Sequence, residues 1–405
     1  MKQHLMTSLS KTQRVSIVLA CAFALAGCST VKGWFGAGKS DKKAAEPAEL
    51  TDFTPTAKVT RLWSAGAGKG EGLLGARQAP AVADGHVYAA AVEGGVRAFD
   101  LQSGQAQWHY EPKAEKDKEP MRLAGGPGAG GGLVVVGGLD GEVVALDAAN
   151  GAEKWRAKVG NEVIAAPAVA DGLVFVRSND GRVTAFDAGS GERRWFWSRE
   201  VPALSVRGND SVAVGPGYVF VGNDDGTVSA LSEQDGRLLW EQAVAQGEGR
   251  SELDRMADVD GTPVLDGTVL YATSFKRQTM AIDGPSGRPI WARDNGGAGR
   301  LGNASDRIVV ADPAGTVWAL DKSSGSALWS QPALARRSLS GVAVQGDYAV
   351  VGDYDGYLHW LRLDNGELAA RARAGGDAIR GHMTVADGIL VVQNTDGEIY
   401  AFRLQ

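Results

Sequence analysis

Few side chains in this sequence could do covalent or acid–base chemistry. The 405 residues include 2 cysteines, Cys21 and Cys28, and both lie close to the N-terminus. The rest of the chain therefore has no thiol for a disulfide, a zinc cluster or a cysteine nucleophile. The histidines are scattered, and no serine and aspartate accompany them as in a catalytic triad: His4, His86, His109, His359 and His382. The sequence predicts no catalytic residue, no metal site and no cofactor.

Cys28 is the cysteine for which the surrounding residues suggest a chemical role. Basic residues precede an apolar run from Val15 to Ala26, which is shorter than the roughly 20 residues that a membrane-spanning helix needs. This pattern predicts a signal peptide over residues 1–27. The ending Leu25-Ala26-Gly27-Cys28 resembles the bacterial lipobox, which implies cleavage before Cys28 and attachment of lipid to its thiol. The alternative is an ordinary signal peptide followed by an incidental cysteine.

The residues after Cys28 indicate where the mature protein resides. Ser29 stands where an aspartate favours retention at the inner membrane in similar lipoproteins, so the resemblance implies a lipid-anchored, periplasm-facing protein of the outer membrane. Residues 28–57 are typical of a flexible tether because they are rich in Gly, Ala, Lys, Glu and Pro. Removal of residues 1–27 takes away three basic residues and no acidic ones, which changes the formal net charge from -6 to -9. That charge argues against nucleic acid as a partner.

A repeat fills residues 58–405. Its clearest copy, from Pro167 to Trp195, has four short stretches of alternating apolar and polar residues, separated by turns at Asp171-Gly172, Asp180-Gly181 and Gly191. This pattern predicts four antiparallel strands joined as a meander. A glycine followed by a tryptophan closes each unit, at a spacing near the roughly 40 to 45 residues of propeller blades: Gly104/Trp108, Gly151/Trp155, Gly191/Trp195, Gly236/Trp240, Gly287/Trp291 and Gly325/Trp329, with Gly366 and Ala370 in a seventh unit.

The two ends of the repeat region complete each other. An eighth unit has Ala401-Phe402 but ends at Gln405 without a fourth strand, whereas the segment around Trp63 has no unit before it. Pairing of this N-terminal strand with the last unit would close the ring and cover an exposed sheet edge. The sequence therefore predicts an all-β fold, an eight-bladed β-propeller of four-stranded antiparallel blades, closed by an N-terminal strand.

The repeated residues have structural explanations. Asp-Gly pairs supply the positive φ angles that two-residue hairpins require, so we interpret these aspartates as turn formers rather than metal ligands. The tryptophans recur at one blade position, where a large apolar ring can pack against the neighbouring blade. We therefore interpret them as core residues and not as a cofactor site.

The repeat resembles that of the pyrroloquinoline-quinone-type propellers, which raises a quinoprotein dehydrogenase as an alternative. Enzymes of that family resemble one another in an adjacent cysteine pair and a set of calcium-site carboxylates. The repeat region has no cysteine, and the chain has no haem-attachment Cys-x-x-Cys-His motif. The sequence thus favours a binding protein over an enzyme.

Two breaks in the repeat are candidates for binding, because rigid scaffolds display binding residues on loops. Residues 202–208 and residues 246–261 each connect the outer strand of one blade to the inner strand of the next. Strands of a meander alternate in direction, so both connections should emerge on the same face of the ring. Leu204 to Arg207 are therefore expected beside Asp258 and Asp260.

Four features together resemble the BamB family, the propeller lipoproteins of the outer-membrane β-barrel assembly machinery. They are the lipobox, the eight repeats, the segment Leu204-Ser205-Val206-Arg207-Gly208 and the run from Asp254 to Asp260. The resemblance implies a non-enzymatic scaffold that docks on the periplasmic domains of BamA and that could also contact unfolded outer-membrane protein strands. It also implies the residues that bind BamA: Leu204, Ser205, Val206, Arg207, Asp258 and Asp260. Arg207 could instead pair with one of the aspartates and brace the two loops. A stand-alone envelope propeller that binds peptide or glycan is the other alternative.

Overall fold

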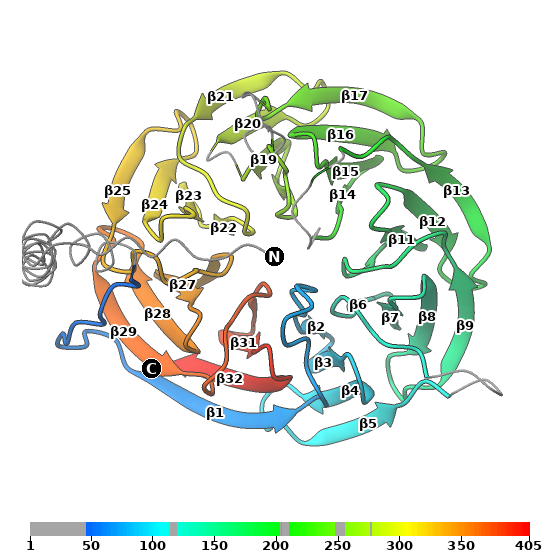
Figure 1. The fold of residues 1–405 in the computed structure, drawn as a ribbon, viewed down its shortest axis with the longest axis horizontal. Helices are drawn as coiled ribbons and strands as arrows, with labels where there is room; N and C mark the ends of the chain where they lie inside the picture. The colour runs from blue at the N-terminus through cyan, green and yellow to red at the C-terminus, as the bar shows by residue number, and fades with distance from the viewer. Residues whose placement is uncertain (1–45, 114–119, 203, 205–209, 248–255, 276–277) are drawn as a thin grey trace, which may run out of the picture. The chain divides into compact units, whose positions relative to one another are not determined.

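The computed structural model describes residues 46–113, 120–202, 204, 210–247, 256–275 and 278–405. The chain divides into two units, residues 1–47 and residues 48–405. The second unit holds all the strands described below. Eight four-stranded antiparallel sheets are arranged around a central axis in this unit (Figure 1). A search of the described residues finds no helix long and apolar enough to cross a membrane.

In each blade the strands run in order from the centre of the ring to its rim. The first four blades are formed by β2 (Ala81–Ala83), β3 (His86–Ala91), β4 (Gly95–Asp100) and β5 (Ala106–Tyr110); β6 (Gly128–Gly130), β7 (Leu133–Gly137), β8 (Glu142–Asp147) and β9 (Glu153–Lys158); β10 (Ala168–Ala170), β11 (Leu173–Arg177), β12 (Val183–Asp187) and β13 (Arg193–Trp197); and β14 (Ala213–Gly215), β15 (Tyr218–Gly222), β16 (Thr227–Ser232) and β17 (Leu238–Ala243).

The remaining blades follow the same order. They are formed by β18 (Val264–Asp266), β19 (Val269–Thr273), β20 (Thr279–Asp283) and β21 (Pro289–Arg293); β22 (Gly302–Asn303), β23 (Arg307–Ala311), β24 (Val317–Asp321) and β25 (Ala327–Gln331); β26 (Ala343–Gln345), β27 (Tyr348–Gly352), β28 (Tyr357–Arg362) and β29 (Leu368–Arg373); and β30 (Thr384–Ala386), β31 (Ile389–Gln393) and β32 (Glu398–Leu404) with β1 (Val59–Gly66).

The eighth blade closes the ring non-covalently, as the sequence predicts. β1 pairs antiparallel with β32, from Val59 opposite Leu404 to Gly66 opposite Glu398, and the two strands lie side by side in Figure 1. Trp63 on β1 is 8% exposed and packs with Ala401 of its own blade and Phe99 of the first blade. The N-terminal strand therefore contributes both a sheet edge and core volume.

The core lies between blades. Each of the eight clusters of buried apolar residues combines side chains from two neighbouring blades, such as Val135 and Trp155 of the second blade with Val174 and Phe186 of the third. Inward-facing residues of adjacent sheets interdigitate in this way at every boundary. The stability of the ring therefore depends on contacts between neighbours, as in other repeat folds.

The aspartates and glycines of the turns adopt the conformations and hydrogen bonds that their residue types predict. Asp171 and Gly172, between β10 and β11, both have positive φ angles, 49° and 76°, as a two-residue hairpin of type I′ requires. Asp321, in the hairpin between β24 and β25, accepts hydrogen bonds from the backbone N–H groups of Ser323 and Ser324 at 3.1 and 2.8 Å. These aspartates thus satisfy backbone groups in turns.

The recurring spacing of Gly and Trp in the repeat reflects a contact between blades. Gly151 of the second blade lies against Trp108 of the first, and a Cβ atom at Gly151 would be 2.5 Å from the indole ring. The indole N–H of Trp108 donates to the carbonyl oxygen of Ala148 at 2.9 Å. Six other tryptophans pack on a glycine of the next blade and donate to one of its carbonyl oxygens: Trp63, Trp155, Trp195, Trp240, Trp291 and Trp329.

The segment before β1 corrects one boundary expected from the sequence. Residues 28–57 were predicted to form a flexible tether, but the backbone N–H of Ala48 donates to Ala335 and that of Thr56 donates to Ala369, both at 2.9 Å. The guanidinium of Arg371 donates to the carbonyl oxygen of Thr51 at 3.2 Å. The packed unit therefore begins at Ala48 and not at residue 58. Residues 1–45, with the predicted signal peptide and Cys28, lie outside the described residues.

Candidate partner-binding face

The two connections singled out in the sequence contact each other. One links β13 to β14 and the other links β17 to β18. The backbone N–H of Asp210 donates to the carbonyl oxygen of Asp260 at 3.0 Å, and that of Thr262 donates to the Asp210 carboxylate at 3.2 Å. We call the face of the ring that carries these outer-to-inner connections the connection face. These two hydrogen bonds join the connections where they lead into the inner strands β14 and β18.

Leu204 is the one predicted docking residue that the structure describes as exposed. Its side chain is 43% exposed, and Val201 nearby in the chain is 42% exposed. The other residues of this segment, Ser205, Val206 and Arg207, lie outside the described residues. The connection therefore presents apolar surface to solvent at Leu204, as a docking residue requires.

Asp258 and Asp260 are buried, at 0% and 1% exposed. The backbone around them is fixed to the neighbouring hairpins, since Val259 N–H donates to Asn223 at 3.0 Å and Phe275 N–H donates to the Asp258 carbonyl oxygen at 2.8 Å. The sequence pattern gave no sign of this burial. Both carboxylates lie beneath the connection face and not on its surface.

Burial gives Asp260 unusual electrostatics. Its carboxylate accepts no hydrogen bond from the described residues, and it forms an ion pair with the Arg77 guanidinium, with Oδ2 and Nη2 3.6 Å apart. Burial raises the pKa of Asp260 to about 7, against the lowering effect of Arg77 and with a further rise from Asp258. Asp260 therefore changes charge near neutral pH.

A second buried ion pair lies next to this site. Arg177, at the end of β11, donates from Nη2 to the Asp224 carboxylate at 3.0 Å, and both side chains are 4% exposed. Asp224 belongs to the hairpin between β15 and β16, so the pair joins the third blade to the fourth. Breaking a buried ion pair leaves an uncompensated charge and is therefore unfavourable. The pair thus holds the third and fourth blades together beneath the connection face.

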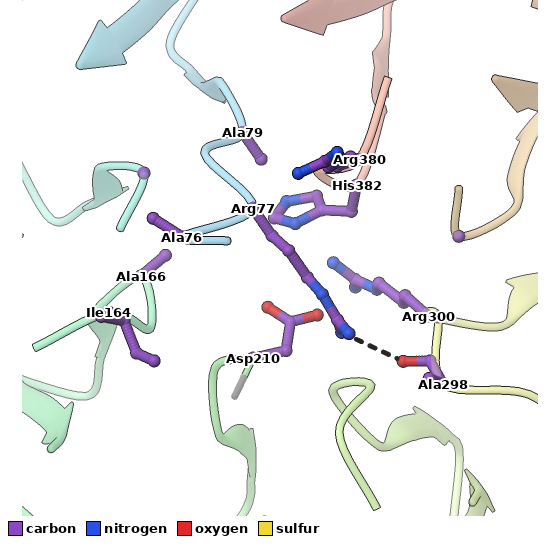
Figure 2. Close-up of a pocket in the computed structure, with 13 residues that line it drawn as sticks. Ala76, Arg77, Ala79, Ile164, Ala166, Asp210, Ala298, Arg300, Arg380 and His382 are labelled. Atoms are coloured by element: carbon purple, nitrogen blue, oxygen red, sulfur yellow. Dashed lines mark hydrogen bonds between the residues drawn. The ribbon is translucent and has the colours of Figure 1, made fainter. Parts of the chain in front are cut away.

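Arg77 crosses the mouth of the central channel. It lies between β1 and β2 and has a positive φ of 50°, and its Nη1 donates to the carbonyl oxygen of Ala298 at 3.4 Å (Figure 2). Arg300, Arg380 and His382 surround the same opening. Sequence reasoning missed this cluster because its residues come from three connections that are far apart in the chain: Arg77 from β1–β2, Arg300 from β21–β22, and Arg380 with His382 from β29–β30.

A buried His–Asp pair also escaped the sequence analysis. His359 Nε2 lies 3.0 Å from Asp353 Oδ2, and Arg337 Nε donates to the same oxygen at 2.7 Å. Arg371 Nε donates to His359 Nδ1 at 3.4 Å, which leaves Nε2 to carry the ring proton. Burial lowers the pKa of His359. Because Arg337 and Arg371 also bind the backbone of Ala48 and Thr51, this network holds the segment before β1.

Metal ligands are not grouped in the described part of the chain: no cluster of three or more His, Cys, Asp or Glu there could hold an ion.

Comparisons with known proteins identify the family. A family model described as "Outer membrane protein assembly factor BamB" matches residues 60–123, 113–331 and 315–404. The protein of that name from Xanthomonas campestris pv. campestris is 65% identical over 404 residues, which cover 99% of this chain and 100% of the relative. This chain belongs to the BamB family. The crystal structure of BamB from Moraxella catarrhalis has a TM-score of 0.75 and 28% identity, covering 85% of this chain and 100% of that one.

Quinoproteins share the propeller fold with this BamB family member. The quinohemoprotein alcohol dehydrogenase of Comamonas testosteroni aligns with a TM-score of 0.66 and 17% identity, covering 88% of this chain and 78% of that one. At this identity the likeness concerns the fold alone. The similar sequences are named as assembly factors and not as enzymes.

Proposed function

We propose that this chain is a non-enzymatic scaffold of outer-membrane protein assembly, anchored by lipid on Cys28 in the outer membrane and facing the periplasm. The observation that carries the proposal is the 65% identity, along the full chain, to a relative named as an outer membrane protein assembly factor. A rigid ring with binding residues on its loops suits a scaffold. The absence of a thiol after Cys28 supports a binding role over a cofactor enzyme.

The connection face is the proposed docking surface for the periplasmic domains of BamA. Leu204 and Arg207 would make the direct contacts, Ser205 and Val206 would extend them, and the exposed side chain of Leu204 supports this role. The buried positions of Asp258 and Asp260 support an indirect role, in which they hold the second connection against the first. Unfolded outer-membrane protein strands are a further candidate partner of the same face.

Capture of BamA tests the docking surface. We expect Leu204→Glu and Arg207→Glu each to weaken capture, because a charge at an apolar contact is unfavourable and loss of a charged interface group typically costs about 2–5 kcal/mol. Leu328→Glu is the matched control, since Leu328 on β25 is 46% exposed and lies outside the two connections.

Variants must remain folded for this comparison, which circular dichroism and thermal melting establish. Charge reversal at Asp258 or Asp260 is unsuitable, because a lysine in these buried positions would destabilise the ring. Wild-type capture by both folded connection variants would place docking elsewhere on the molecule.

A further inference from the structure

The entrance of the central channel is a narrow cavity on the connection face. It has a volume of about 30 Å³ and is lined by connections that lead into the inner strands. A wider channel of about 620 Å³, walled by the inner strands, adjoins it, and Arg300 and His382 border both spaces. The entrance has room for a few water-sized groups, so a ligand could place one small group there and extend into the channel.

Positive charge gathers at this entrance. The guanidinium groups of Arg77, Arg300 and Arg380 lie around it, as Figure 2 shows. Within the described part of the chain, Arg300 and Arg380 are exposed and their guanidinium groups donate no hydrogen bond. Their forks of N–H donors are therefore available to a ligand. The whole chain, in contrast, has a formal net charge of -6.

The carboxylates nearby offset only part of this charge. Asp210 lines the entrance and accepts hydrogen bonds from the N–H groups of Ser211 at 2.8 Å and Thr262 at 3.2 Å. Against the raising effect of burial, His382, Arg300 and these hydrogen bonds lower the pKa of Asp210, so its carboxylate contributes one negative charge at neutral pH. Glu71 interacts electrostatically with Arg380, and burial raises the pKa of Glu71. Burial lowers the pKa of His382 against the raising effect of Asp210, and Arg300 lowers it further, so this ring adds no fixed charge at neutral pH. The entrance keeps an excess of positive charge.

We propose that the channel entrance binds an oxyanion, a carboxylate or phosphate group, between Arg300 and Arg380. Guanidinium groups bind both anions through paired, charge-assisted hydrogen bonds. A recess walled by small residues, such as Ala76 and Ala166, lets the anion approach the arginines without steric hindrance. The ligand would be a small molecule or the end of a chain, because the cavity is too narrow for a folded domain.

The proposed anion site is separate from the proposed BamA contacts. Arg77 is 3.6 Å from Asp260 and so couples to the second connection, which makes Arg77 a poor choice for a test. Arg300 and Arg380 take no part in the hydrogen bonds of Asp210 with Asp260 and Thr262 that join the two connections, although Arg300 interacts electrostatically with Asp210. Loss of anion binding and loss of BamA capture can therefore be distinguished by substituting these two arginines.

The experiment is calorimetric titration of the full lipidated chain in detergent, in a buffer free of oxyanions. The probes are inorganic phosphate, acetyl-trialanine with a free carboxylate, and the same peptide with a C-terminal amide. The test variant is Arg300→Gln with Arg380→Gln. The control is Arg194→Gln with Arg237→Gln, which removes equal charge from two arginines that are 58% and 72% exposed.

We expect the wild-type and control proteins to bind phosphate, the free-carboxylate peptide or both, and the test variant to bind at least about tenfold more weakly. Phosphate binding alone would identify a phosphate ligand, and peptide binding that the amide abolishes would identify a carboxylate. The proposal is overturned if no probe binds at millimolar concentration, or if the folded test variant binds as the wild-type protein does.

Discussion

Asp260 shows how the environment of one residue can reverse the usual role of a carboxylate. Several aspartates in this fold lie in turns, where hydrogen bonds stabilise the ionised form, and such bonds lower the pKa of Asp321 to about 2. The Asp260 carboxylate accepts no such bond from the residues that the structure describes and is buried, so its pKa rises to about 7. The two groups therefore make opposite contributions to the pH dependence of stability.

The first prediction concerns Asp260→Asn. An unfolded aspartate ionises near its ordinary pKa of 3.8, whereas Asp260 in the folded ring stays protonated up to about pH 7. The free energy of unfolding should therefore fall as pH rises from about 4 to 7, by up to roughly 4 kcal/mol at ~1.4 kcal/mol per pKa unit. The asparagine variant should lack this decrease and exceed the wild-type stability at pH 8.

Denaturant unfolding at pH 5 and pH 8 measures this difference. Asp321→Asn is the control without a change between these two pH values, because the lowered pKa of Asp321 stabilises the folded state equally at pH 5 and pH 8, and this stabilisation is lost only as pH falls from about 4 toward 2. Parallel pH profiles for wild-type and Asp260→Asn proteins would show that Asp260 is ionised throughout.

The second prediction concerns Cys28, the only cysteine after the predicted signal peptide. If its thiol carries the lipid, Cys28→Ser should incorporate no labelled fatty acid and should leave the membrane fraction. Two or more acyl chains give stable anchoring, so the change in fractionation should be nearly complete. Labelled fatty acid on the Cys28→Ser protein would contradict the prediction.

Contacts between blades explain the spacing of Gly and Trp in the repeat. The Gly and Trp of one unit are close in the sequence, but the contact that constrains them joins the Trp of one blade to the Gly of the next. In the seventh blade, Ala370 stands in the place of Trp. The eighth blade, which would supply the facing glycine, has no hairpin between its third and fourth strands, because the third strand is β32 and the fourth is β1 from the other end of the chain. The exception therefore follows from ring closure.

The third prediction compares two glycines with similar backbones. Gly151 and Gly172 have φ angles of 73° and 76°, but a Cβ atom would be 2.5 Å from Trp108 at Gly151 and would meet nothing within 4 Å at Gly172. Alanine at Gly172 should cost about 1–2 kcal/mol for its left-handed conformation. Alanine at Gly151 should add a packing penalty of about 1–3 kcal/mol. Equal midpoints of denaturant unfolding for the two variants would exclude the packing explanation.

The sequence predicted the strands, turns and blade count well because these depend on local patterns. Alternating residues and Asp-Gly pairs define each hairpin regardless of the rest of the chain. The burial of Asp258 and the convergence of Arg77, Arg300 and Arg380 depend on contacts between remote segments, which no local pattern records. The packing of Thr51 and Thr56 was missed for the same reason, since residues 28–57 taken together are rich in Gly, Ala, Lys, Glu and Pro and so resemble a free tether.

On the scale of the whole molecule, the ring is a cycle of eight similar interfaces. Each core cluster joins two neighbours, so an open ring would lack one cluster and would expose two blade faces. The strand β1 takes part in the junction between the eighth and first blades through Trp63, whose indole N–H donates to the Leu101 carbonyl oxygen at 2.9 Å. This junction is where the two ends of the folded chain meet.

The last prediction is that removal of β1 opens the ring. Deletion of residues 58–66 leaves β32 with an unpaired edge and removes Trp63 from its cluster. Loss of a buried Trp alone typically costs about 3–5 kcal/mol, and loss of the strand adds the unpaired backbone groups of β32. The unfolding midpoint should therefore fall well below that of the full chain. Trp63→Ala should reproduce the side-chain part of this loss, whereas Leu328→Ala, at a side chain 46% exposed on β25, should have little effect. A deletion variant with an unchanged midpoint would mean that the ring is held closed without β1.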